Sequence, residues 1–140
     1  MNILSLSSDR KLFEGGSAVA ARMRLYGGLV ENLHIIVTAK RSLDLTDTAL
    51  SPITYLYPTN ALTRAGHIVR ALMIAHTLAR RGEWIDVVTA QDPFELGFAA
   101  FLIAHLLRAR LHLQIHTDFM SPYFVQGSFM NRMRVPLARF

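Results

Sequence analysis

The sequence of 140 residues contains no cysteine, which excludes a disulfide-stapled scaffold, zinc sites built on thiolates and a thiol nucleophile. It also lacks a long apolar run. The longest, Phe94 to Leu107, is interrupted by Glu95 and His105 and is shorter than the roughly 20 residues that a membrane-spanning helix needs. No basic segment of the kind that opens a cleavable signal peptide precedes the short apolar run at residues 1–6. We therefore expect a cytoplasmic protein.

Disorder is not indicated, because hydrophobic residues make up 51% of the chain and charged residues only 18%. The net charge of +5 is modest, but it is unevenly placed. No acidic residue follows Asp118, whereas Arg132, Arg134 and Arg139 do. Two interpretations stay open: a peripheral contact of this basic segment with an anionic partner or the inner face of the membrane, and a solvated basic face. We expect no nucleic-acid partner.

Short β-branched or apolar runs alternate with helical patterns along the chain. The predicted strands are residues 2–8, 33–39, 53–57, 84–90 and 110–116, and the predicted helices are 17–29, 63–81 and 93–108. Ser17 is expected to cap the first helix, Gly82 to end the second and Pro93 to open the third. Residues 40–51 read as a polar loop. This alternation predicts an α/β, Rossmann-like parallel sheet with helices on both faces.

Residues 128–140 begin like a helix but lack a cap or a closing glycine. We therefore expect the domain 1–140 to be incomplete at its C-terminus, so that further strands are missing.

Ligands of open parallel sheets bind beyond the carboxyl ends of the strands. Four predicted loops lie there: residues 9–17, 58–64, 90–94 and 116–122. In the first, Gly15 and Gly16 precede a helix, where bare backbone can approach an anion closely. In the second, Arg64 is placed to hold a phosphate, and in the third Asp92 lies between a strand and a helix. Each feature also has an interpretation without a ligand: the two glycines could form an ordinary turn, the arginine could be solvated, and the aspartate could be a helix N-cap.

The fourth loop carries His116, followed by Thr117 and Asp118. A histidine at this edge can donate a hydrogen bond to a ligand hydroxyl or stabilise developing charge. It does not form a zinc site with His112, because four residues of strand separate the two by about 13 Å. The other histidines are scattered over other predicted elements, and we expect none of them to bind a ligand; they are His34, His67, His76 and His105.

Several catalytic motifs are missing from these loops. There is no P-loop, no G-x-S-x-G elbow and no G-x-G-x-x-G fingerprint. A dinucleotide-binding oxidoreductase domain would share the fold, but its second strand should end in an acid, whereas this one ends Thr38-Ala39-Lys40. A non-catalytic α/β interaction module with a basic C-terminus is the other alternative.

Three segments in this order resemble the N-terminal domain of retaining glycosyltransferases of family 4, which consist of two Rossmann-like domains with a cleft between them. They are DRKLFEGGS at 9–17, TAQDPFELG at 89–97 and QIHTDF at 114–119. The resemblance covers essentially the whole chain. It implies transfer of a glycosyl group from a nucleotide sugar to an acceptor hydroxyl with retained configuration and without a metal or other cofactor. The acceptor would be a sugar or a lipid-linked sugar.

The resemblance also implies roles for the loop residues. Gly15 and Gly16 would lie against the phosphates of the sugar nucleotide and the acceptor, and His116 would contact the donor sugar, with Thr117 and Asp118 beside it. Asp92 would line the same cleft, and Arg64 would hold an anionic acceptor. The nucleotide-binding second domain of such enzymes has no counterpart here, so we expect the parent protein to be the enzyme and this chain alone to be inactive.

Overall fold

The computed structural model describes residues 1–114. His116, Thr117, Asp118 and the predicted helical start at 128–140 lie outside the described residues. The elements are β1 (Asn2–Ser7), α1 (Ala18–Gly27), β2 (Asn32–Val37), β3 (Thr48–Ser51), β4 (Thr54–Pro58), α2 (Arg64–Arg80), β5 (Val87–Ala90), α3 (Glu95–Leu107) and β6 (Arg110–Leu113), with single 3-10 turns at Arg10–Phe13 and Arg41–Leu43. Each predicted strand and helix has a counterpart among them.

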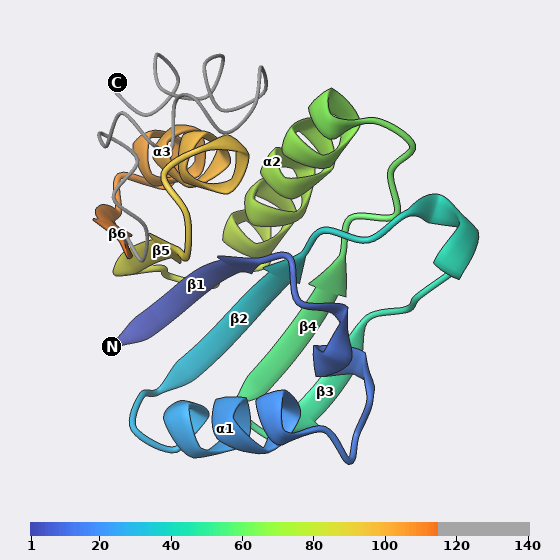
Figure 1. The fold of residues 1–140 in the computed structure, drawn as a ribbon. Coiled ribbons are helices and arrows are strands. Elements are labelled where there is room, and N and C mark those ends of the chain that lie inside the picture. Colours follow the sequence, from blue (N-terminus) through green and yellow to red (C-terminus); the bar gives the residue numbers. More distant parts are fainter. Residues whose placement is uncertain (115–140) are drawn as a thin grey trace, which may run out of the picture.

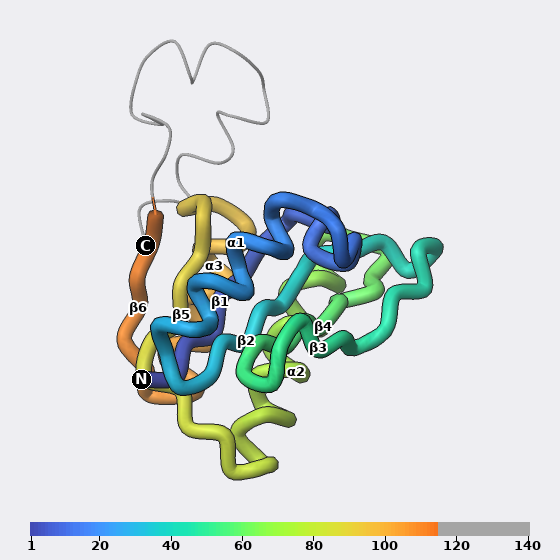
Figure 2. The backbone as a smooth tube through the Cα atoms, turned by 90° about the horizontal axis from the view of Figure 1, so that it is seen from below, coloured from blue at the N-terminus to red at the C-terminus, as the bar shows by residue number. Residues whose placement is uncertain are grey.

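The strands form one six-stranded sheet in the order β3-β4-β2-β1-β5-β6. Every neighbouring pair is parallel except β3 with β4. Helix α1 covers one face of the sheet, and α2 and α3 cover the other (Figure 1). Seen from the side of α1, the strands follow one another from β6 to β3 (Figure 2). The predicted α/β, Rossmann-like fold is confirmed.

Two apolar layers hold the sheet between its helices. On the side of α2 and α3, Leu4, Leu6 and Ile36 pack with side chains of both helices. On the side of α1, Ile35 and Val37 form the second cluster. Residues 33–37 of β2 alternate between the two layers and are all buried, which explains why this run is apolar at every position except His34.

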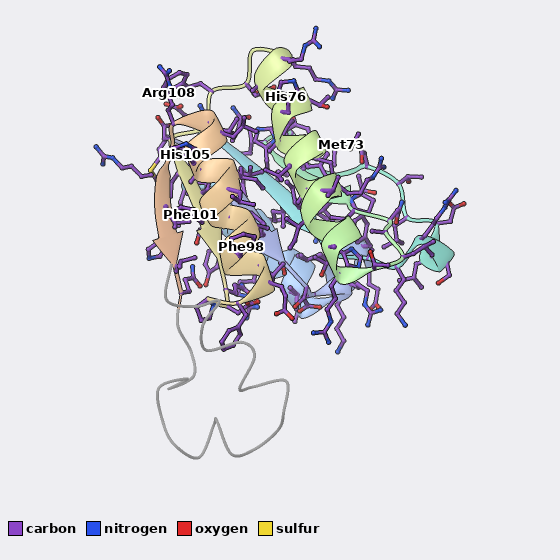
Figure 3. All side chains as sticks on the ribbon, turned by 90° about the horizontal axis from the view of Figure 1, so that it is seen from above. Met73, His76, Phe98, Phe101, His105 and Arg108 are labelled. Atoms are coloured by element: carbon purple, nitrogen blue, oxygen red, sulfur yellow. The ribbon has the colours of Figure 1, made fainter. Side chains whose placement is uncertain are left out.

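Helices α2 and α3 lie side by side on their face of the sheet (Figure 3). Their outer sides carry side chains that are exposed, among them Met73 and His76 on α2 and Phe101 and His105 on α3.

Two of the residues predicted to end or cap helices do so in the structure. The Ser17 hydroxyl accepts a hydrogen bond from the backbone N–H of Ala20, as an N-cap should. Gly82 follows the end of α2 with a φ of +85°, a conformation that costs glycine nothing.

Three predictions need correction. Residues 40–51 are not all loop, because Thr48–Ser51 forms the edge strand β3 against β4. The strand predicted from Trp84 begins only at Val87, and Trp84 is exposed. The third helix begins at Glu95, because Pro93 lies in a turn in which the Asp92 carboxylate accepts the N–H of Phe94. Asp92 is therefore not the N-cap of α3; Phe94 is.

Candidate functional site

A cavity of about 250 Å³ opens at the carboxyl edge of the sheet, between the first turns of α2 and α3. Leu6, Ile36 and residues of the two helices form its apolar wall. Its polar lining consists of Ser8, Thr38, Arg64, His67, Asp92 and Glu95. Six polar side chains, from the loops after β1, β2 and β5 and from both helices, therefore meet in one place, at the edge where parallel sheets bind ligands.

An ion pair joins the two helices at the mouth of the cavity. Arg64 Nη1 lies 2.9 Å from Glu95 Oε1, and the side chain of Arg64 is 63% exposed. Glu95 lies in the first turn of α3, where the positive end of the helix dipole favours a carboxylate. Because a guanidinium has five N–H donors, Arg64 can keep this pair and still donate to a ligand.

His67 presents a defined edge to the cavity. Its Nδ1 lies 2.6 Å from Thr59 Oγ1, and this buried hydroxyl already accepts the N–H of Ala39. The hydroxyl has a single proton, and within residues 1–114 the ring nitrogen is the acceptor in reach. We therefore assign the proton of the ring to Nε2, the nitrogen that does not bond Thr59. Burial lowers the pKa of His67, so the ring is a neutral donor at pH 7.

The carboxylate of Asp92 is held at the cavity by the turn that it closes. Its Oδ1 accepts the N–H of Phe94 at 2.8 Å. The turn packs so closely on α3 that a Cβ on Gly97 would lie 2.6 Å from the Asp92 carbonyl oxygen. Glycine at position 97 therefore permits the close approach of this turn to α3.

The fold brings only some of the predicted site residues to this cavity. Arg64 and Asp92 line the same cavity. Gly15 and Gly16 are exposed, and neither belongs to its lining. Their loop is ordered by Arg24, whose guanidinium donates to the Gly15 carbonyl oxygen at 3.0 Å. The roles of the two glycines stay a prediction, as do those of His116, Thr117 and Asp118, which the structure does not describe.

Sequence reasoning assigned no role to Ser8, Thr38 and Glu95, and it expected no ligand at His67, although all four line the cavity. Helical spacing could have found His67, because it follows Arg64 by three residues and so shares its face of α2. Glu95 could have been paired with Arg64 only by knowing that α2 and α3 are neighbours.

No helix within 1–114 is long and apolar enough to cross a membrane. Among the same residues, no three histidine or acidic side chains are grouped as metal ligands.

The sequence matches no family model and no curated protein. Among solved structures, the chain is similar to the UDP-GlcNAc 2-epimerase from Methanocaldococcus jannaschii, with a TM-score of 0.51 and 19% sequence identity. The match covers 98% of this chain and 36% of that chain, so the protein described here spans about a third of its structural neighbour. A likeness at this identity concerns the fold.

Proposed function

We propose that this chain forms one wall of the active-site cleft of an enzyme that acts on nucleotide sugars. More narrowly, we propose the acceptor-side domain of a retaining glycosyltransferase similar to family 4. The observation that carries the proposal is the convergence of Arg64, His67, Asp92 and Glu95 on one cavity at the carboxyl edge of a parallel sheet. The resemblance of three loop segments to that family supports it further.

The lining of the cavity suits a sugar unit. Asp92 and Glu95 can accept hydrogen bonds from hydroxyl groups, and His67 Nε2–H can donate one. The volume of about 250 Å³ lies below the roughly 300–1,000 Å³ of sites that enclose drug-sized ligands, so it would hold one sugar ring but not a whole nucleotide sugar. Arg64, exposed at the mouth, would bind an anionic group of the acceptor.

In this proposal the remaining predicted residues complete the cleft. Gly15 and Gly16 would face the donor phosphates, and His116, Thr117 and Asp118 would contact the donor sugar. A second domain would bind the nucleotide, and no metal or other cofactor is required. Transfer would then depend on positioning and on stabilisation of the leaving diphosphate.

A second candidate is epimerisation of a nucleotide sugar, favoured by the printed activity of the structural neighbour. Both candidates share the class of substrate but differ in product, because only transfer requires an acceptor. An α/β interaction module without catalysis would instead show no affinity for sugar phosphates at this cavity.

Replacing Arg64 by glutamine should weaken the binding of a sugar phosphate about tenfold. The reason is that a charge-assisted hydrogen bond to phosphate contributes about 1.5–3 kcal/mol, less at an exposed site. Titration of the 140-residue chain with glucose 6-phosphate, followed by amide NMR shifts in α2 and α3, measures the effect. Arg80→Gln, at the far end of α2, is the matched control. Equal losses in both variants, or no shifts near the cavity, would count against the proposal.

The 140-residue chain by itself should show no turnover of nucleotide sugars. In the proposed enzyme the nucleotide is bound mainly by the second domain, so this chain supplies only one wall of the cleft. Incubation with UDP-glucose and UDP-GlcNAc, with glucosides as acceptors, followed by chromatography of the products, tests this. Robust transfer, epimerisation or hydrolysis by the purified chain would require a different mechanism.

A further inference from the structure

A second cavity, of about 370 Å³, lies at the opposite edge of the sheet, between the start of β2, the strands β3 and β4, and the end of α2. Its lining includes His34, Asp47, Tyr55, Tyr57, Arg81 and Glu83. His34 is near the beginning of β2, whereas Thr38 of the first cavity follows its end. Four residues of strand correspond to about 13 Å, so the two cavities are separate places.

The most constrained group in this cavity is the imidazole of His34. The residue is 1% exposed, and its ring stacks on Tyr55 and Tyr57 with centroid distances of 5.6 and 5.9 Å. Nδ1 lies 3.1 Å from the hydroxyl oxygen of Tyr57. Nε2 is buried and has no hydrogen-bond partner among the described residues. A buried polar atom without a partner is costly, so a ligand that supplies one gains affinity from it.

The hydrogen bond with Tyr57 determines which ring nitrogen of His34 carries the proton. Burial raises the pKa of Tyr57 to about 12, so its hydroxyl keeps its proton at neutral pH and needs an acceptor. Within residues 1–114 that acceptor is His34 Nδ1. Burial also lowers the pKa of His34, so the ring is neutral and its single proton is on Nε2.

The Nε2–H group faces a carboxylate that it does not reach. Glu83 Oε2 is 3.8 Å away, which is too long for a hydrogen bond. A hydroxyl group placed between them can accept from Nε2–H and donate to Glu83. An ammonium group can only donate, so it would leave Nε2–H without an acceptor. A phosphate or carboxylate would be repelled by Glu83 and Asp47, whose two negative charges exceed the single positive charge of Arg81 in the lining.

We propose that this cavity binds a neutral glycosyl unit, with one sugar hydroxyl bridging His34 Nε2–H and Glu83. Tyr55, which is partly exposed in the wall, offers an aromatic side chain that suits the apolar face of a sugar ring, whereas Tyr57 is buried against His34. The cavity is far larger than the roughly 30 Å³ that one water occupies, so a single bridging water would leave most of it unused. This second sugar site does not rest on the function proposed for the first cavity.

The experiment is a titration of the ¹⁵N-histidine-labelled 140-residue chain with three probes: methyl β-D-glucopyranoside, N-acetylglucosamine and cellobiose. Without a probe, the ring spectrum of His34 should show a neutral ring protonated at Nε2. At least one sugar should then shift the His34 resonances saturably. Glu83→Gln should weaken that binding about fivefold, because it replaces a charged acceptor by a neutral one. Glu31→Gln, at an exposed glutamate in the loop before β2, is the matched control and should leave it unchanged.

Arg64→Gln separates the two sites, because it acts on the first cavity only and should leave the His34 titration unaltered. The proposal is overturned if none of the three sugars shifts His34, which would leave a water-filled cavity. It is also overturned if the chain binds ethylammonium here more tightly than any sugar, or if His34 carries its proton on Nδ1.

Discussion

The Gly27→Ala variant should lose about 3 kcal/mol of unfolding free energy, near the upper end for overpacking a core. Gly27 is the last residue of α1, and a Cβ built on it would lie 2.0 Å from Thr54 Oγ1. Thr54 is fully buried at the start of β4, so its side chain has little room to move. The contact that fixes α1 on the sheet therefore has no space for a methyl group. Urea unfolding followed by circular dichroism measures the loss.

Two companion variants isolate the cause. Gly15→Ala should stay within about 0.5 kcal/mol of the unchanged chain, because nothing lies within 4 Å of its added Cβ. The double variant Gly27→Ala/Thr54→Ala should recover stability to within about 1 kcal/mol, since it removes the clashing hydroxyl. That hydroxyl has no hydrogen-bond partner among residues 1–114, so its loss costs little. An unimpaired Gly27→Ala variant would mean that α1 packs differently.

The parallel sheet could be predicted from the sequence because its evidence is local. The run from Leu33 to Val37 is apolar at every position but one, as a strand covered on both faces must be. The Ser17 hydroxyl binds the backbone N–H of a residue three positions on, and Gly82 acts through its own φ angle, so both signals can be recognised without knowing the fold. The edge strand Thr48–Ser51 was missed because only its pairing with β4 makes it a strand.

The position of the candidate site could be predicted from one rule: loops that follow parallel strands lie at the carboxyl edge of the sheet. Arg64 and Asp92 both line the cavity at the carboxyl edge, where that rule predicts them, and their roles there stay a prediction. The Arg64–Glu95 pair could not be predicted, because it spans 31 residues and depends on how α2 packs on α3. The surroundings of the buried His34 could not be predicted either, since its stacking on Tyr55 and Tyr57 follows from the register of β2 on β4.

The stability of the chain should fall as the pH drops below about 6.5, and His34 should be a main cause. Burial lowers the pKa of its ring below the ordinary value of 6.5, and the nearby Glu83 carboxylate offsets only part of this shift. Below that value the unfolded chain binds a proton that the folded chain excludes, so acid favours unfolding; above it both states are neutral and the effect vanishes. One such group contributes at most about 1.4 kcal/mol per pH unit, or about 2 kcal/mol by pH 5.

Urea unfolding between pH 5 and 8 gives this slope directly. His34→Gln should flatten the pH dependence even if the variant is less stable throughout, because glutamine does not titrate. A remaining slope is expected from His67, whose pKa burial also lowers. His76→Gln, at an exposed position on α2, should leave the curve parallel to that of the unchanged chain. If His34→Gln also runs parallel, the ring takes up protons equally in both states, and the neutral, buried imidazole on which the second cavity depends is not present.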